Sequence, residues 1–145
     1  MNRLYIDCNI LMDWFTNREP HAFPAVQLLM VVENKQCVGF VSPLTLSNTF
    51  FLLQKAYSKT VAYEFLKDAQ RLFVIVDITK KHVTKAINDR YKDFEDDMHY
   101  MVARDNRMTH IITRNKSDFK TNENIKIQTA EEYIKENEIA KGEAR

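Results

Sequence analysis

The sequence predicts an α/β protein in which helices cover both faces of a parallel sheet. Short apolar runs alternate with longer segments of helical periodicity along the 145 residues. With only two glycines and three prolines, the chain leaves little room for long structureless loops. At this length we expect one domain, which we place at residues 1–135, followed by a charged tail at 136–145.

The first half of the chain begins with a strand and then turns mostly helical. The apolar run at 4–6 is typical of a buried strand, and Arg18-Glu19-Pro20 ends the short helix that follows it. Ser42-Pro43 suits the start of a helix. The expected elements are a strand at 4–6, helices at 11–15 and 22–35, a strand at 38–41, and helices at 44–56 and 60–71.

The second half repeats the alternation with shorter strands. Thr79 is placed to cap a helix, Asp93 opens another, and Thr129 with Glu132 forms a capping box for the last one. The expected elements are a strand at 73–76, helices at 79–87 and 93–107, strands at 110–112 and 125–127, and a final helix from 129.

Charge and cysteine content exclude several classes of protein. The net charge of +1, from 21 basic and 20 acidic residues, gives no overall field for nucleic acid, so such a partner needs a local patch. Cys8 and Cys37 suggest reduced thiols rather than a disulfide framework. No apolar run approaches the ~20 residues that span a bilayer. We therefore expect a cytoplasmic protein with no membrane segment.

Asp7 is the first candidate for a functional residue. It directly follows the apolar run at 4–6, where a carboxylate is costly unless something positive meets it. The carboxyl ends of parallel strands are also where open α/β sheets build their binding sites. Asp7 is therefore predicted to lie in a site on that edge of the sheet.

A run of acids opens the helix near residue 93. Asp93, Glu95, Asp96 and Asp97 place four carboxylates within five residues. Acids favour a helix N-terminus by ~0.3–1 kcal/mol each, but repulsion among four offsets that gain. Taken alone the run is typical of a solvated helix start, whereas together with Asp7 it favours a site for a hard divalent cation. Asp96 is our choice of inward ligand, and Asp97 would be a supporting ligand or exposed.

The strand at 110–112 runs into a polar and basic loop. Thr113, Asn115 and Asp118 would lie at its carboxyl end, on the same edge as Asp7, although Asn and Asp are also ordinary turn residues. Arg114 and Lys116 would contact a phosphate backbone, or else belong to an ordinary solvated surface.

These motifs together resemble a PIN domain, the metal-dependent ribonuclease fold of VapC-type bacterial toxins. The resemblance covers about residues 3–135. The sequences of the motifs are similar to those of a Bacteroidetes-type branch of the family. The motifs that carry it are Ile6-Asp7-Cys8-Asn9, Ser42-Pro43-Leu44-Thr45-Leu46-Ser47-Asn48, Asp93-Phe94-Glu95-Asp96, and Ile112-Thr113-Arg114-Asn115 with Asp118-Phe119.

The resemblance implies a three-layer α/β/α fold with a central, mostly parallel sheet. It also implies Mg²⁺ or Mn²⁺ as cofactor, an antitoxin protein as partner, and a homodimer. By position, Asp7 and Asp96 resemble the family's metal-binding aspartates, and Asn9 resembles the asparagine that braces the turn after the first strand. Ser42 and Thr45 form a Ser-x-x-Thr pattern that the family also has.

The sequence departs from the family at two positions. The family commonly has Glu where this chain has Asn48, and Asp where it has Asn115. An asparagine offers a neutral oxygen, which coordinates a cation without neutralising it. Asp93, Asp97 or Asp118 would compensate for the missing charge.

Three functions follow from these patterns. The leading hypothesis is an endoribonuclease in which a cation on Asp7 and Asp96 activates water and polarises a phosphodiester of RNA, with Asn48, Asn115 and Asp118 orienting the site. The alternative is a catalytically weakened PIN module that binds RNA or a protein. An aspartyl phosphotransferase is disfavoured, because that chemistry places a second Asp where this chain has Asn9.

Overall fold

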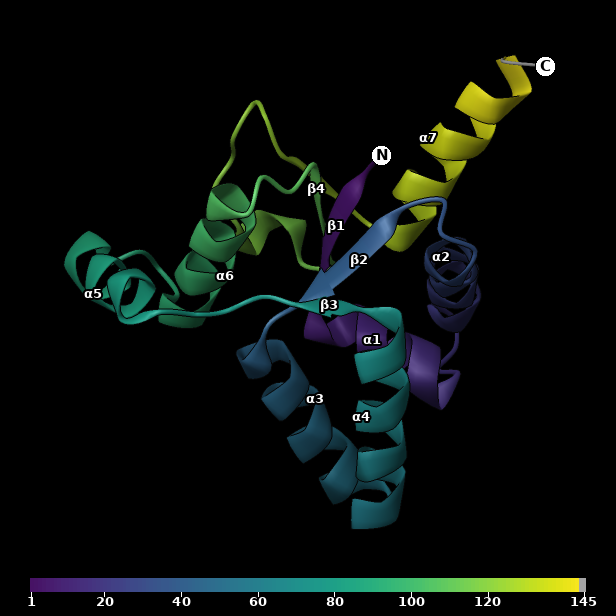
Figure 1. The fold of residues 1–145 in the computed structure, drawn as a ribbon, viewed down its shortest axis with the longest axis horizontal. Helices are drawn as coiled ribbons and strands as arrows, with labels where there is room; N and C mark the ends of the chain where they lie inside the picture. Colours follow the sequence, from purple (N-terminus) through teal and green to yellow (C-terminus); the bar gives the residue numbers. More distant parts are fainter. Residues whose placement is uncertain (144–145) are drawn as a thin grey trace.

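The protein is a sheet of five parallel strands with helices on both faces, as the sequence predicts (Figure 1). The computed structural model describes residues 1–143, with side chains described up to residue 137. The strands are β1 (Arg3–Ile6), β2 (Val38–Val41), β3 (Val74–Ile75), β4 (His110–Ile112) and β5 (Lys126–Gln128). Their order in the sheet is β3-β2-β1-β4-β5.

The helices fall close to their expected positions. They are α1 (Cys8–Thr16), α2 (Ala22–Glu33), α3 (Pro43–Ala56), α4 (Lys59–Leu72), α5 (Lys80–Asp89), α6 (Phe94–Asp105) and α7 (Ala130–Glu143), with a 3-10 turn at Lys116–Asp118. Ser42 begins α3 by accepting a hydrogen bond from the Thr45 amide, and Pro43 takes the first helical position. Within the described part of the chain, no helix is long and apolar enough to cross a membrane.

Alternating side chains of the strands fill two cores. Leu4 and Ile6 of β1 pack on one face of the sheet, in a cluster that draws on α1, α2, α3, α4 and α7. Tyr5 points to the other face, where Met101 and Val102 of α6 lie. Figure 1 shows α5 and α6 on that second side, so the chain has the three layers that the resemblance implies.

The strand order places a switch point at the middle of the sheet. From β1 the chain builds outward through β2 and β3 on one side, and later through β4 and β5 on the other. A crevice at the carboxyl ends of the central strands is where open α/β sheets bind ligands. Asp7, Ser42 and Thr113 directly follow β1, β2 and β4 at this edge.

The expected boundary between domain and tail is not marked by a change of secondary structure. Helix α7 runs through residue 135 to Glu143. The side chains of 138–145 lie outside the described residues, so a separate tail at 136–145 stays a prediction.

Candidate active site at the carboxyl edge of the sheet

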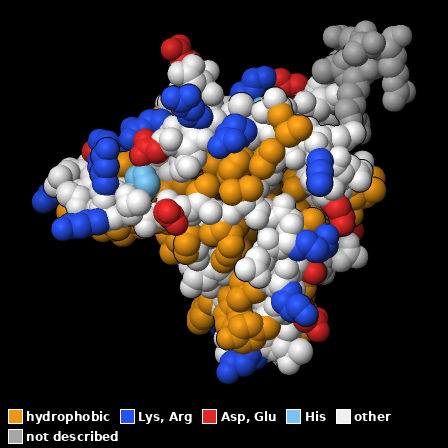
Figure 2. Space-filling view, viewed as in Figure 1, with side chains coloured by type: hydrophobic (Ala, Val, Ile, Leu, Met, Phe, Trp, Pro, Cys, Tyr) orange, Lys and Arg blue, Asp and Glu red, His pale blue; other side chains and the backbone are white. Residues whose placement is uncertain are grey.

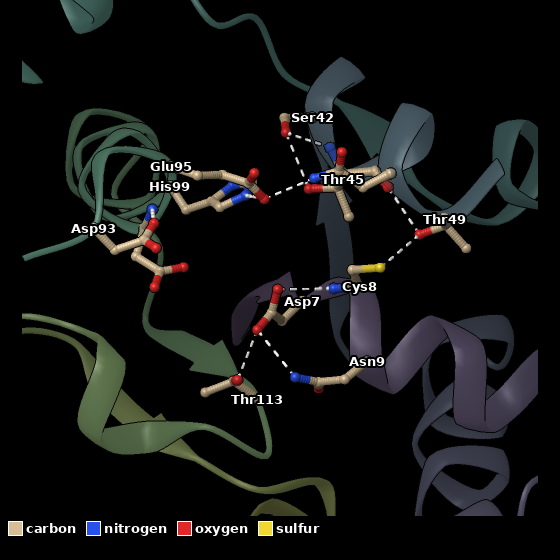
Figure 3. Close-up of polar contacts among 12 residues, drawn as sticks. Asp7, Cys8, Asn9, Ser42, Thr45, Thr49, Asp93, Glu95, His99 and Thr113 are labelled. Atoms are coloured by element: carbon tan, nitrogen blue, oxygen red, sulfur yellow. Dashed lines mark hydrogen bonds and ion pairs between the residues drawn. The ribbon is translucent and has the colours of Figure 1, made fainter. Parts of the chain in front are cut away.

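Asp7 is held in one orientation by four neighbours from two strand ends. Its Oδ1 accepts a hydrogen bond from the Cys8 amide at 2.8 Å, which caps α1. Its Oδ2 accepts from Thr113 Oγ1 at 2.7 Å and from Asn9 Nδ2 at 3.3 Å (Figure 3). The Asp7 amide donates to the Ile112 carbonyl at 3.0 Å, which fixes β1 against β4.

Asn9 ties the same turn to the loop after β4. Its Oδ1 accepts a hydrogen bond from the Arg114 amide at 3.2 Å, while its Nδ2 donates to Asp7. Thr113 is fully buried, and its Oγ1 also accepts from the Asn115 amide at 3.0 Å. These contacts place Asn9 and Thr113 against the carboxylate of Asp7, and their supporting role in a catalytic site stays a prediction.

Asp96 lies among other acids in the first turn of α6. Partial burial, together with the negative charges of Asp93, Asp7 and Asp118, raises the pKa of Asp96 to about 6. The Asp96 amide donates to Asp93 Oδ1 at 2.9 Å, so Asp93 is the cap of the helix. The carboxylates of Asp7 after β1 and of Asp118 after β4 are therefore near enough to Asp96 of α6 for their charges to raise its pKa.

This donor set fits a hard divalent cation. Mg²⁺ and Mn²⁺ take oxygen ligands, and Mg²⁺ is commonly held by one or two carboxylates together with water and substrate phosphate. Burial raises the pKa of Asp96 most, and the nearby negative charges raise it further. A cation between Asp7 and Asp96 would offset those charges. Among the described residues, however, no three His, Cys, Asp or Glu side chains gather closely enough to form a protein-only cage.

Asp97 lies in a different environment from Asp7 and Asp96. Its side chain is completely buried, and Asp97 Oδ1 is 2.7 Å from Lys120 Nζ. Lys120 also lies 3.4 Å from Asp89 Oδ2 and 5.0 Å from the centre of the Tyr91 ring. Asp97 is therefore not the exposed residue that was one of its two predicted places, and its ion pair with Lys120 fastens the loop before β5 to α6. A supporting role for Asp97 beside a metal stays a prediction.

Arg114 is likewise occupied by an ion pair. Its Nε lies 2.8 Å from Oδ2 of the fully buried Asp13, whose Oδ1 is 2.9 Å from Arg18 Nη2. Because Asp13 is completely buried, it needs these two cations. This ion pair anchors the loop after β4 to α1, and the contact of Arg114 with phosphate stays a prediction.

The remaining predicted residues lie along the rim. Asn115 and Lys116 are exposed, and Lys116 Nζ is 2.9 Å from Glu132 Oε1. Asp118 is half-buried, and its carbonyl accepts a hydrogen bond from Tyr91. Thr45 is buried and its Oγ1 lies 3.0 Å from Ser42 Oγ.

The structure contains a buried polar network behind the site that the sequence analysis did not predict. The Tyr5 hydroxyl lies 2.8 Å from Ser42 Oγ and 2.5 Å from His99 Nδ1. Burial raises the pKa of Tyr5 to about 12, so it stays a neutral phenol. His99 Nε2 in turn lies 3.4 Å from Glu95 Oε1. The only sequence signal for this network is the four-residue spacing of Glu95 and His99 on one helix.

Asn48 makes its contact through nitrogen. Its Nδ2 donates to Glu95 Oε1 at 2.6 Å, across the gap between α3 and α6. The sequence analysis gives Asn48 a supporting role that orients the site, and the structure shows its amide donating to the carboxylate of Glu95. Cys8 is not an activated nucleophile, since burial raises the pKa of its thiol.

Comparison with known proteins gives one consistent result. A family model described as PIN domain matches residues 3–117. Ribonuclease VapC1 of Aquifex aeolicus (strain VF5) is 24% identical over 136 residues, which are 90% of this chain and 92% of that protein.

Two solved structures share the fold at low sequence identity. One is Mycobacterium tuberculosis VapC20, described as a sarcin-ricin loop cleaving toxin, with TM-score 0.62, 15% identity, and coverage of 74% of this chain and 86% of that one. The other is a toxin-antitoxin complex from Klebsiella pneumoniae, with TM-score 0.62, 22% identity, and coverage of 84% and 94%.

Proposed function

The chain belongs to the PIN-domain family, and on this basis we propose that it is a metal-dependent endoribonuclease, the toxin of a toxin–antitoxin pair. The observation that carries the proposal is the convergence of Asp7 and Asp96, with Asp93 and Asp118 nearby, at the switch point of the sheet. The printed descriptions of the relatives, a ribonuclease and a toxin that cleaves the sarcin-ricin loop, support RNA as the substrate.

Asp7 and Asp96 are the proposed ligands of Mg²⁺ or Mn²⁺. A cation bound there would lower the pKa of a water molecule and polarise the scissile phosphodiester. Thr113 and Asn9 orient Asp7 through its Oδ2, leaving the carboxylate fixed before a cation arrives. A carboxylate that is already oriented can hold the metal in a fixed position relative to the phosphate of the substrate.

The exposed loop after β4 is the proposed contact with RNA. Lys116 pairs with Glu132 at the surface, and such exposed pairs contribute only ~0–1 kcal/mol, so Lys116 is free to exchange Glu132 for a phosphate. Asn115 and Asp118 flank Lys116 on this loop and would orient the substrate or the metal-bound water. A backbone contact of this kind positions RNA without reading its sequence.

A protein partner is the second part of the proposal. Figure 2 shows apolar side chains gathered over the α3–α4 hairpin at the bottom of the view. Phe51, Tyr57 and Tyr63 of this region are each more than half exposed. Exposed apolar patches mark interaction surfaces, which supports an antitoxin or a second copy of the chain as partner. A homodimer and a cytoplasmic location stay predictions.

A catalytically weakened module that binds RNA is the second candidate. It is favoured by the lack of a three-residue acid or histidine cage among the described side chains, and by the neutral residues at 48 and 115. Such a module would bind RNA without cutting it, in the presence or absence of metal.

The experiment that separates the two is an RNA cleavage assay with the purified full chain. Structured RNA and single-stranded DNA are incubated with Mn²⁺, with Mg²⁺, or with EDTA. We expect cleavage of RNA with either metal, and a loss of about a hundredfold or more in EDTA. RNA that is bound but never cut would favour the second candidate, and cleavage that persists in EDTA would contradict a metal-dependent reaction.

A further inference from the structure

Residues 80–92 concentrate positive charge on a protein that is nearly neutral as a whole. The chain has a net charge of only +1, whereas Asp89 is the sole acid of this stretch. Figure 2 shows Lys and Arg side chains gathered at the left of the view, where Figure 1 places α5. We call the exposed cations of the stretch the basic segment, which consists of Lys80, Lys81, Lys85, Arg90 and Lys92.

Acidic neighbours leave most of this charge unneutralised. Asp89 is already shared between two lysines, with its Oδ1 3.3 Å from Lys85 Nζ and its Oδ2 3.4 Å from Lys120 Nζ. The other four cations form no ion pair within the part of the chain that the structure describes. Unpaired charge of one sign attracts a polyanion such as a nucleic acid.

The C-terminal end of the basic segment is fastened to the rim of the proposed active site. Tyr91 Oη donates a hydrogen bond to the Asp118 carbonyl at 3.0 Å, and Lys92 Nζ donates to the Ser117 carbonyl at 2.5 Å. Both carbonyls belong to the 3-10 turn in the loop after β4, which we propose as a contact with RNA. A strand bound at this loop is therefore adjacent to the basic segment.

Helix α5 carries the segment away from this rim. His82 lies near the start of α5, and its Nε2 is 2.9 Å from Oδ2 of Asp105, the last residue of α6. Because α6 begins at the site with Asp96 in its first turn, α5 runs antiparallel to α6 and leads back from the site. With 10 residues, α5 is about 15 Å long. Its lysines extend the positive surface over that distance.

An exposed aromatic residue lies along the chain between the basic segment and the acids of the site. Phe94 is the first residue of α6, directly after the cap Asp93 and two residues before Asp96. It is 48% exposed, so the core takes up only part of its ring. Unpaired bases of RNA stack on such rings, and each stack is worth ~1–3 kcal/mol.

A solvated helix face and an acidic polypeptide are the alternatives to RNA. A solvated face explains exposed lysines on α5, but it requires neither their continuity with the rim nor an exposed aromatic beside it. Protein interfaces are built around an apolar centre, and Ile87 is the large apolar side chain that α5 exposes. RNA needs no such centre, because its phosphates dominate the affinity. The charge, the rim and Phe94 together favour RNA.

We propose that the basic segment binds the phosphate backbone of the RNA strand next to the cleaved bond, and that Phe94 stacks on one of its bases. The inference rests on the proposed function and adds a surface for the substrate outside the metal site. Phosphates and base faces are common to all RNA sequences, so this surface raises affinity without selecting a sequence.

The test is fluorescence anisotropy of a labelled single-stranded RNA with the full chain in EDTA, where binding is measured without metal. One variant combines Lys80→Gln, Lys81→Gln and Arg90→Asn, since asparagine tolerates the left-handed backbone of Arg90 (φ 50°). We expect RNA affinity to fall about tenfold or more. The slope of log affinity against log salt should fall by about 2, or ~0.7 for each lost phosphate contact.

A matched variant controls for net charge. Lys55→Gln, Lys59→Gln and Lys67→Gln remove the same charge from exposed positions of α3 and α4 and should leave RNA binding unchanged. If both triple variants lose the same affinity, net charge alone explains the binding and the inference is overturned. It is also overturned if poly-glutamate displaces RNA at equal charge, because the surface then takes an acidic polypeptide.

Phe94 is tested separately. Phe94→Leu keeps an apolar side chain without the ring and should weaken RNA binding about fivefold or more, whereas Phe94→Tyr should bind as the wild type does. A Phe94→Leu variant with wild-type affinity would overturn the stacking contact. Thermal melting verifies that each variant retains the fold.

Cleavage with Mn²⁺ separates this inference from the function on which it rests. If the wild type cuts RNA and the triple variant of the basic segment binds RNA normally, the segment is overturned as an RNA surface and the nuclease proposal stands. If RNA binding depends on the segment but the wild type never cuts RNA, the nuclease proposal is overturned and the RNA surface stands.

Discussion

Asp96→Asn is expected to reduce metal-dependent RNA cleavage by about a hundredfold or more, and at the same time to raise the melting temperature of the metal-free protein. The first effect follows from losing a proposed ligand. The second follows from burial of the charged carboxylate and from its repulsion by Asp93, Asp7 and Asp118, which together raise the pKa of Asp96 to about 6.

The sign of the stability effect depends on pH. The folded-state pKa of Asp96 lies above its ordinary value of 3.8, so the folded protein favours the protonated acid. That contribution to stability is fully present below pH 3.8 and is lost as pH rises through about 6. At pH 7 the ionised Asp96 therefore opposes folding, and an asparagine removes both the partly buried charge and its repulsion by the neighbouring acids.

Thermal melting in EDTA at several pH values measures this effect. The gain from Asp96→Asn should be largest at pH 7 and should vanish near pH 4. Asp77→Asn, at an exposed position, is the control and should change neither melting nor cleavage. A variant that cleaves RNA normally, or that melts lower at pH 7 than the wild type, would contradict the role of Asp96.

Asp13→Asn is expected to lower the free energy of unfolding by about 2–3 kcal/mol. Asp13 is completely buried and pairs with Arg114 at 2.8 Å and Arg18 at 2.9 Å. Removing one partner of a buried pair costs ~3–5 kcal/mol, and we take a lower value because both arginines are partly exposed. Since Arg114 anchors the loop after β4, RNA cleavage should fall as well.

Urea unfolding measures the loss, and a surface ion pair supplies the control. Glu33 and Arg71 lie 3.3 Å apart with both side chains more than half exposed, so Glu33→Gln should cost no more than ~1 kcal/mol. If both variants lose the same free energy of unfolding, the buried ion pairs of Asp13 stabilise the fold no more than an exposed ion pair does, which would contradict the prediction.

The sequence predicted the elements and the edge of the sheet that carries the site, because both depend on local patterns. The alternation of short apolar runs with helical periodicity is read within windows of a few residues, and the strands at 38–41 and 110–112 have the predicted bounds. Asp7 was found because a carboxylate directly after an apolar strand is unusual in any context.

The sequence did not reveal contacts between distant residues. The helix pattern allows Asp97 to be a supporting ligand or exposed, and does not reveal its partner Lys120, which lies in a loop 23 residues away. The basic loop predicts a phosphate contact for Arg114 and does not reveal its partner Asp13, which lies 101 residues earlier. The Asn48–Glu95 pair, 47 residues apart, depends on how α3 packs beside α6. Periodicity carries no information about such pairs.

The central claim is that Asp7 and Asp96 hold a divalent cation, and calorimetric titration of Mn²⁺ at several pH values tests it most directly. We expect binding at pH 7 that weakens about tenfold for each pH unit below 6, because a proton and the cation compete for Asp96. We also expect Asp7→Asn to abolish the binding. A wild type that binds no Mn²⁺ at millimolar concentration, or an Asp7→Asn variant that binds it equally well, would contradict the claim.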